Sequence, residues 1–454
     1  MRRKYPKICV RDFGPFQEAD IELKPLTLII GRNSVGKSIL AYLIWSLAIT
    51  MPDPKRLGRE AEKKGAENLA RKILDEIRKG KNPKHSLRKF IKIYIEALPE
   101  ALAVDFGETL QRVFMAKPGE LVRTGADRAT ITVESPNASV EFTIKNHHTT
   151  ATSSRHYLEY LDELETTILR SNILRVSFAG EEIFESQVAS LHDVASILLL
   201  ILVDYLYEAY SPFFTSEKLA ALLADSRAGI SRTLLKPYLS PKEISEISYP
   251  DGYFVRLYYR LAEKLAEGVI NLDPLKPLLK ELGCEIEHAY EGGAYTVYVK
   301  TWTGKRLPLP RAPSGIRESL TVALALASPA APHLVIIEEP EAHLHPRAQL
   351  ALARLVVKAV NELRKTVVIT THSDYFVYRL SNMIALSQIS QKAKELGFTE
   401  TEALAPHVVA AYLARPEDRK AILTPLQVTS EGIPEEEFAE VAEELASERA
   451  RILA

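Results

Sequence analysis

An eight-residue glycine-rich segment, Gly31–Ser38 (GRNSVGKS), constrains the fold of this chain more than any other feature. It fits the pattern G-x-x-x-x-G-K-[ST], it follows the apolar run Leu26–Ile30, and it precedes a helix-forming run that is apolar on nearly every side. A phosphate-binding loop needs this order, because a strand and a helix hold the loop while its backbone N–H groups point at phosphate oxygens. The segment therefore predicts a nucleotide-binding loop within an α/β fold.

The residues of this loop have distinct expected roles. The two glycines let the backbone curl around phosphate oxygens, and the helix N-terminus adds about half a positive charge. Lys37 supplies a point charge for the β- and γ-phosphates, and Ser38 offers its hydroxyl to Mg²⁺. The loop residues expected to bind the nucleotide are Gly31, Asn33, Ser34, Val35, Gly36, Lys37 and Ser38.

A second segment, Leu334–Pro346 (LVIIEEPEAHLHP), places two consecutive carboxylates directly after a strand of the buried type. Ligands of open α/β sheets bind at the carboxyl ends of the strands, so both side chains are expected beside the phosphates. We expect Glu338 to hold Mg²⁺ through its water shell and Glu339 to polarise the attacking water.

Two shorter segments complete the predicted site. His372 follows the apolar run Val367–Ile369 at another strand end, where an imidazole can hydrogen-bond a γ-phosphate. Ser314 and Gly315 precede a helix-forming run, so the serine hydroxyl and nearby backbone N–H groups can form a second anion site. The expected catalytic residues are Glu339, His372 and Lys37, the expected metal ligands are Ser38 and Glu338, and Ser314 and Gly315 join the nucleotide-binding set.

In chain order, GRNSVGKS, PSGIRE, LVIIEEPEAHLHP and THS resemble the four phosphate-side motifs of ABC-type ATPases. They are most similar to the soluble branch that includes SMC-like, RecF-like and OLD-type proteins. The resemblance covers about residues 1–50 and 300–454, and ADSRAGI at 224–230 is a weaker echo of the same branch. The sequence departs from the family pattern at Glu338, where Asp is usual.

The resemblance implies ATP and Mg²⁺ as cofactors, slow hydrolysis at Glu339, and a γ-phosphate sensor at His372. It also implies that Ser314 and Gly315 act in trans, so that two chains face each other head to tail and each closes on the γ-phosphate bound by its partner. ATP would then hold a homodimer together, and hydrolysis would release it.

We expect an α/β fold: a P-loop NTPase head of the ABC type with a mixed or parallel central sheet, an N-terminal antiparallel β part and a large, mainly helical insertion. The ATP-binding head is predicted at residues 1–50 with 300–454, and the insertion at 51–299. Within the insertion, hairpins are predicted across Pro136-Asn137 and Gly292-Gly293, and helical stretches at about 155–172, 186–209 and 252–282.

The leading functional hypothesis is an ATP-driven conformational switch that acts on nucleic acid or on a partner protein in DNA maintenance or defence. The alternative is an ATPase subunit that regulates a separate nuclease or effector protein without binding DNA itself. An intrinsic nuclease of the OLD type is disfavoured, because the segment after His372 contains no Asp-x-Asp pair.

Charge and composition limit the partners. The formal net charge of -1 argues against a protein that coats nucleic acid by bulk charge. A local DNA surface is predicted at Arg71–Lys92, which carries nine Lys/Arg and two acidic residues, with Arg2, Arg3 and Lys4 as an extension. The chain has two distant cysteines, no signal-peptide core, and no apolar run near the about 20 residues of a membrane span. These features predict a cytoplasmic protein without a membrane partner.

Overall fold

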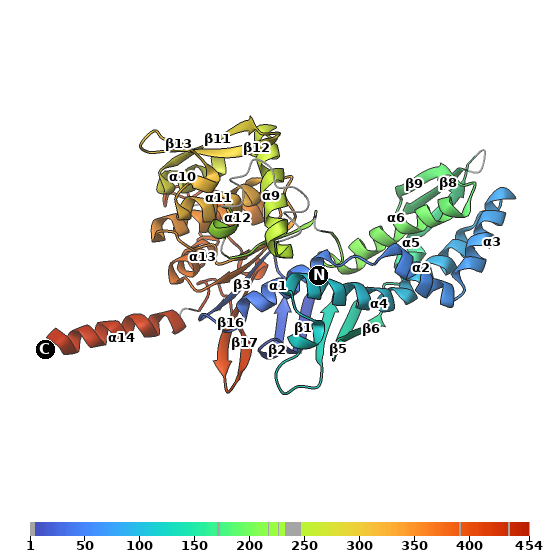
Figure 1. Cartoon of the computed structure of the whole chain (residues 1–454), viewed down its shortest axis with the longest axis horizontal. Helices are drawn as coiled ribbons and strands as arrows, with labels where there is room; N and C mark the ends of the chain where they lie inside the picture. The colour runs from blue at the N-terminus through green and yellow to red at the C-terminus, as the bar shows by residue number, and fades with distance from the viewer. Residues whose placement is uncertain are drawn as a thin grey trace. The chain divides into compact units, whose positions relative to one another are not determined.

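The computed structural model of the chain (Figure 1) describes residues 5–169, 173–216, 218–225, 227–231, 247–389, 392–434 and 436–453. Arg2, Arg3 and Lys4, the predicted extension of the DNA surface, lie outside the described residues. The chain divides into two compact units. Unit 1 comprises Met1–Ile21 and Ser46–Glu217, and unit 2 comprises Glu22–Trp45 and Lys218–Ala454. Each unit therefore combines two separate stretches of the sequence.

A mainly parallel sheet forms the centre of unit 2. Its strands lie in the order β10 (Ala220–Leu223), β14 (Leu334–Glu338), β15 (Thr366–Thr371), β3 (Leu26–Gly31), β16 (Val409–Glu417) and β17 (Lys420–Leu426). The first five strands run parallel, and β17 returns antiparallel to β16. All residues of β3, β10 and β14 are buried, which explains why these strands are almost continuously apolar in the sequence.

Three neighbouring strands of this sheet carry motif residues at their carboxyl ends. β15 lies between β14 and β3, and the pairs Glu338–Thr370 and Ile30–Thr371 bring the three strand ends level with one another. The loop Gly31–Ser38 and the residues Glu339 and His372 therefore leave the sheet at the same edge.

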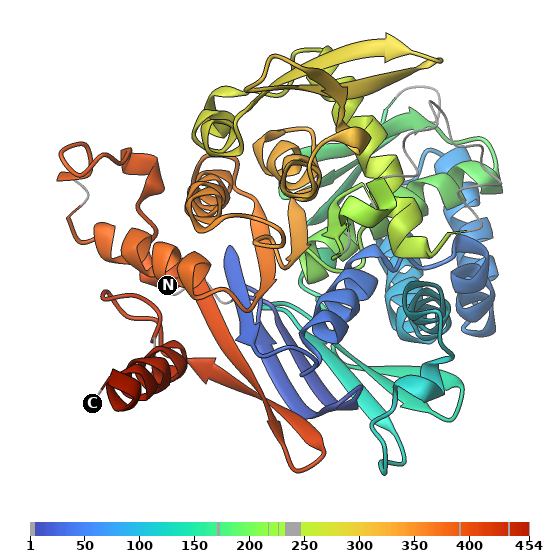
Figure 2. The ribbon, with the colours of Figure 1, turned by 60° about the vertical axis from the view of Figure 1, so that its left-hand side comes forward.

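Unit 2 also contains several helices. They include α1 (Lys37–Ile49), whose residues up to Trp45 belong to unit 2, and α7 (Arg227–Ile230), α9 (Tyr249–Ala266), α10 (Lys276–Leu282), α11 (Ser314–Ala327), α12 (Pro346–Glu362), α13 (Asp374–Leu386) and α14 (Glu436–Leu453). A small antiparallel sheet contains β11 (Cys284–Glu291), β12 (Ala294–Thr301) and β13 (Arg306–Pro308). In Figure 2, α11 and α12 (orange) lie between this small sheet (yellow) and the central strands.

Unit 1 combines an antiparallel sheet with long helices. Its strands lie in the order β2 (Phe16–Glu22), β1 (Lys7–Phe13), β4 (Ala129–Glu134), β5 (Ser139–Lys145) and β6 (His148–Arg155). The helices are α2 (Pro54–Lys63), α3 (Ala66–Arg78), α4 (Lys84–Phe114) and α6 (Leu191–Tyr210), and α4 contacts β6, α2 and α3. The predicted fold class, with its N-terminal antiparallel part, is confirmed.

One predicted helix, at residues 155–172, is wrong. The described residues of this stretch form only a short helix, α5 (Tyr160–Glu163), followed by strand β7 (Leu164–Ile168). This strand pairs with β8 (Ile173–Phe178), which pairs with β9 (Glu181–Gln187). Leu164 and Thr166 are buried while their neighbours are exposed, and Thr166, Thr167 and Ile168 are β-branched, so a period of two prevails over helix formation.

Most other predicted elements of residues 51–299 are confirmed. The stretch 186–209 corresponds to α6, the stretch 252–282 contains α9 and α10, and the two predicted hairpins are β4–β5 and β11–β12. β10 was not predicted, although it pairs in parallel with β14. Among the described residues, no helix is both long and apolar enough to span a membrane.

Candidate nucleotide-binding and catalytic site

The phosphate loop connects β3 to α1 in unit 2. Gly31 has φ +152, and a Cβ at this position would lie 2.3 Å from the carbonyl oxygen of Ala414 in the neighbouring strand β16. Gly36 has φ +95, which L residues rarely adopt. These two glycines therefore satisfy different demands: the first permits close strand packing, and the second permits the turn into the helix.

Lys37 is the first residue of α1, and its side chain is buried under the loop. Its Nζ donates to the carbonyl oxygens of Gly31 at 2.9 Å and Arg32 at 2.8 Å. Burial lowers the pKa of Lys37, and the nearby carboxylates of Glu339, Glu341 and Glu338 act in the opposite direction. The ammonium group is thus already held at the concave side of the loop, where β- and γ-phosphates would need it.

Glu338 ends strand β14 and is almost completely buried. Its Oε2 accepts a hydrogen bond from the backbone N–H of Asp225 at 3.2 Å, and its carboxylate also interacts with the Ser38 hydroxyl. Burial raises the pKa of Glu338, while the hydrogen bond from Ser38 lowers it. Within the described part of the chain, Oε1 of Glu338 has no hydrogen-bond partner.

The Ser38 hydroxyl and the Glu338 carboxylate together fit Mg²⁺, which prefers hydroxyl, carboxylate, water and phosphate ligands. The longer Glu338 side chain still reaches Ser38, so the departure from the usual Asp does not separate the two groups. No three His, Cys, Asp or Glu side chains of the described residues are grouped to hold a metal. A bound Mg²⁺ would therefore depend on phosphate oxygens and water for its remaining ligands.

Glu339 follows directly and has an unusual backbone. Its φ is +41, a conformation that costs about 1–2 kcal/mol for an L residue. Its N–H donates to the carbonyl oxygen of Thr370 in β15 at 2.9 Å. The half-exposed side chain places Oε1 3.3 Å from Nδ1 of His372. The predicted base and the predicted sensor are thus adjacent at the strand ends.

Glu341 is a buried carboxylate whose role was not predicted. Its Oε1 accepts hydrogen bonds from the Thr371 hydroxyl at 2.6 Å and from the backbone N–H of His372 at 2.9 Å. The same oxygen lies 3.5 Å from the imidazole Nδ1 of His372. Glu341 therefore fixes the end of β15 and the direction in which His372 points. The repeated glutamates of the segment EEPE were the only sequence signal for it.

Ser314 and Gly315 form the first turn of α11, with Pro313 at the N-cap position. Both residues are half-exposed, and no side chain caps this helix end. A Cβ on Gly315 would lie 2.8 Å from the carbonyl oxygen of His343, so a glycine is needed where α11 approaches the segment after β14. Within the described residues, no hydrogen bond joins Ser314 to the phosphate loop.

The basic stretch Arg71–Lys92 forms the end of α3 and the start of α4 in unit 1. Seven of its nine cationic side chains have a carboxylate or carbonyl partner. The ion pairs are Arg71–Glu67, Lys72–Glu76, Lys79–Asp75, Lys84–Glu165 and Lys92–Glu96, and Arg78 and Arg88 donate to backbone carbonyls. The stretch therefore carries less uncompensated charge than its sequence indicates.

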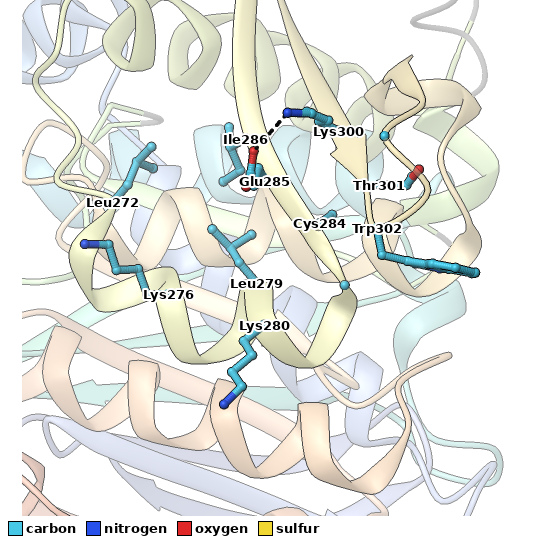
Figure 3. Close-up of a pocket in the computed structure, with 12 residues that line it drawn as sticks. Leu272, Lys276, Leu279, Lys280, Cys284, Glu285, Ile286, Lys300, Thr301 and Trp302 are labelled. Atoms are coloured by element: carbon cyan, nitrogen blue, oxygen red, sulfur yellow. Dashed lines mark ion pairs between the residues drawn. The ribbon is translucent and has the colours of Figure 1, made fainter.

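A separate cavity of about 650 Å³ lies between α10 and the small sheet (Figure 3). Its wall includes Leu279, Ile286 and the side chain of Trp302, which is 86% exposed. Lys300 and Glu285, which are paired on neighbouring strands of the small sheet, form an ion pair at 3.8 Å in the wall of this cavity. None of the predicted site residues lines it, so it is distinct from the phosphate loop.

Comparison with known proteins gives a family match for the middle of the chain. Residues 206–377 match the family model described as "AAA domain, putative AbiEii toxin, Type IV TA system". The matched region contains Ser314, Glu338, Glu339 and His372 but not the phosphate loop Gly31–Ser38. No curated protein matches the sequence.

Similar solved structures are heads of SMC proteins. An SMC head bound to the C-winged helix domain of ScpA has 11% identity and a TM-score of 0.44, covering 93% of this chain and 98% of that chain. A head with an extended coiled coil, bound to the C-terminal domain of ScpA derived from Pyrococcus furiosus, has 11% identity and a TM-score of 0.43, covering 97% and 99%. The head from Thermotoga maritima has 10% identity and a TM-score of 0.36, covering 94% and 100%. These values are too low to assign a function.

The family match and the strand order agree with the resemblance that the motifs indicate. Residues 206–377 are thus similar to an AAA domain, in keeping with the resemblance of the motifs to those of P-loop ATPases.

Proposed function

We propose that this chain binds Mg-ATP at the motif-bearing edge of the unit 2 sheet, hydrolyses it slowly, and forms a head-to-tail homodimer while ATP is bound. The observation that carries this proposal is the convergence of three groups at that edge. These are Lys37 under its loop, Ser38 beside Glu338, and Glu339 beside His372.

Each of these side chains has a part in the proposed reaction. Lys37 neutralises charge on the β- and γ-phosphates, while Ser38 and Glu338 hold Mg²⁺, which supplies further charge neutralisation when bound. Glu339 accepts a proton from the attacking water, and His372 hydrogen-bonds a γ-phosphate oxygen. We expect slow hydrolysis, since the proposed role of the cycle is to form and release the dimer, and this role does not require rapid production of ADP.

The proposed dimer follows from the position of Ser314 and Gly315, which correspond to the signature motif of ABC-type ATPases. Ser314 and Gly315 are half-exposed at a helix N-terminus, where uncapped N–H groups and the helix dipole favour an anion. They make no hydrogen bond with the phosphate loop of their own chain within the described residues. A second copy that presents this helix end to the γ-phosphate completes the site, and loss of that phosphate releases it.

We propose that the cycle serves DNA maintenance or defence, with residues 51–299 as an insertion that meets the partner and residues 1–50 with 300–454 as the head. The ion pairs along Arg71–Lys92 favour the alternative hypothesis, in which the chain regulates a separate nuclease or effector protein without binding DNA itself. A DNA surface would need free cations to displace counterions from phosphates, and most of these side chains have protein partners.

The test is light scattering of the Glu339→Gln variant with and without Mg-ATP. Removing the base should leave nucleotide binding intact and trap the closed state, so the mass should rise from one chain to two. Ser314→Arg in the same background should abolish the rise while ATP still binds. If ATP binds and the mass does not respond, the in-trans model is wrong.

A salt titration of nucleic-acid binding separates the two partner hypotheses. Binding that falls steeply with salt and weakens when Lys81 and Lys89 are neutralised would support a DNA surface at this stretch. Absence of binding by the trapped dimer would support the effector-regulating form.

A further inference from the structure

Arg227, in the segment that is only a weak sequence echo, is completely buried in unit 2. Its side chain is 1% exposed, as is the side chain of Glu318, whose Oε2 lies 3.1 Å from Nε of Arg227. Burial lowers the pKa of Arg227, and Glu318 and Glu338 act in the opposite direction. A charge this deeply buried is retained only where it is paired and hydrogen-bonded.

The guanidinium group hydrogen-bonds three separate segments. Nε donates to the carbonyl oxygen of Glu318 at 3.2 Å, in the second turn of α11. Nη1 donates to the carbonyl of Glu338 at 2.7 Å, and Nη2 donates to the carbonyl of Glu339 at 3.0 Å. Nη1 also donates to the carbonyls of Leu223 at 3.1 Å and Ala224 at 2.6 Å, at the end of β10.

These contacts connect helix α11, which carries Ser314 and Gly315, to the strand end that carries Glu338 and Glu339. Glu318 lies one helical turn after Ser314, on the helix whose N-terminus is exposed. Glu339 has the φ of +41 described above, and its peptide is held on both sides: its N–H by Thr370 and its carbonyl by Arg227. Because the guanidinium plane is rigid, it fixes the separation between α11 and the backbone of both carboxylate residues.

We infer that Arg227 is a positioning residue that couples the signature helix α11 to the backbone of the proposed general base, Glu339. This inference rests on the proposed function. Engagement of Ser314 and Gly315 by a partner's γ-phosphate moves or steadies α11, and Arg227 transmits that state to Glu339. Arg227 itself touches neither the phosphates nor the attacking water.

A second ion pair of unit 2, in which the glutamate is buried, provides a control. Arg354 in α12 binds Glu402 through Nε at 2.8 Å and Nη2 at 2.7 Å, and Glu402 is almost fully buried. Neither residue hydrogen-bonds a motif residue. Arg227→Met and Arg354→Met each remove an arginine that pairs with a buried glutamate, although Arg354 itself is 25% exposed. Only the first substitution disconnects α11 from Glu339.

The experiment compares wild type, Arg227→Met, Arg227→Lys and Arg354→Met in thermal melting, binding of a fluorescent ATP analogue, and single-turnover hydrolysis. Both methionine variants should melt earlier, and both should retain the wild-type affinity for nucleotide. Only Arg227→Met should lose hydrolysis, by about 100-fold, as expected when a reacting group is displaced by about 1 Å. Arg227→Lys should recover melting temperature more than hydrolysis, because lysine keeps the charge without the planar fork.

Hydrogen exchange of Ser314–Glu318 gives a readout that does not depend on turnover. A nonhydrolysable ATP analogue should slow exchange there in the wild type and in Arg354→Met, but not in Arg227→Met. Equal behaviour of the two methionine variants in hydrolysis and exchange overturns the inference. A wild type that binds ATP without hydrolysing it or dimerising overturns the proposed function instead, and the exchange comparison still decides the coupling.

Discussion

Two charged regions of this molecule, the phosphate edge of unit 2 and the basic stretch Arg71–Lys92 of unit 1, use their charges in opposite ways. At the phosphate edge, Lys37, Glu338 and Arg227 are buried and each is held by named backbone or hydroxyl partners. Along the basic stretch, the charges are largely exposed and pair with their neighbours on the surface. The energetic effect of removing a charged residue therefore depends on its burial rather than on the number of charges nearby.

The largest expected effect is on turnover. Glu339→Gln should reduce steady-state phosphate release by about 10²–10⁴-fold, because general-base catalysis is lost while the backbone contacts of the residue remain. Glu96→Gln, beside the basic stretch, removes a carboxylate that pairs with Lys92 and should leave release unchanged. Equal rates of phosphate release for Glu339→Gln and wild type would show that Glu339 is not the general base.

The next effect compares two glycines. Gly31→Ala should lower the free energy of unfolding by about 2–4 kcal/mol, since its Cβ meets a strand carbonyl at 2.3 Å in addition to the backbone cost. Gly80, in the basic stretch, has φ +65, and a Cβ added there would meet no other atom within 4 Å. Gly80→Ala should therefore lower the free energy of unfolding by only about 1 kcal/mol. Urea denaturation measures both, and equal costs would mean that β16 moves aside for the alanine.

A smaller effect concerns pH and Glu338. Its pKa is raised in the folded chain, so the folded state binds more protons than the unfolded state and its stability falls as the pH rises through the range where this carboxyl ionises. Glu338→Gln should therefore raise the unfolding free energy of the nucleotide-free protein at neutral pH, by on the order of 1 kcal/mol, while weakening Mg²⁺-dependent ATP binding. Thermal melts at pH 5 and pH 8 test this prediction. The melting temperature of Glu338→Gln should exceed that of the wild type by more at pH 8 than at pH 5.

The smallest effect belongs to unit 1. Lys84→Ala breaks an ion pair with Glu165 at 2.6 Å, yet both side chains contact solvent, so it should change the unfolding free energy by at most about 0.5 kcal/mol. Chemical denaturation at low and high salt measures this value. A loss as large as that of Gly31→Ala would contradict the distinction between the two regions.

The sequence predicted most of the sheet edge because its signals are local. A phosphate loop, a strand with two carboxylates and a strand with a following histidine are each contiguous, and parallel pairing necessarily brings their ends together. Arg227 could not be found in this way, since its partners Glu318, Glu338 and Glu339 are distant in the chain and two of them accept through backbone carbonyls.

Several strands were missed, and β10 and β7 illustrate a related reason. β10 is four residues long and borders a segment without a clear period, and only its pairing with β14 identifies it. β7 is only five residues long, so its β-branched residues and alternating burial are a weak local signal, and its pairing with β8 completes the strand. Both outcomes depend on tertiary contacts that local propensity does not contain.

The strand that carries the phosphate loop has consequences for how the chain is made. β3 pairs on one side with β15, which begins at Thr366, and on the other with β16, which begins at Val409. At a synthesis rate of about 5–20 residues per second, the apolar run Leu26–Ile30 leaves the ribosome on the order of tens of seconds before either neighbour exists. For most of translation the apolar run Leu26–Ile30 therefore lacks both of its native strand partners, and the phosphate loop cannot reach its native surroundings until those strands have been made.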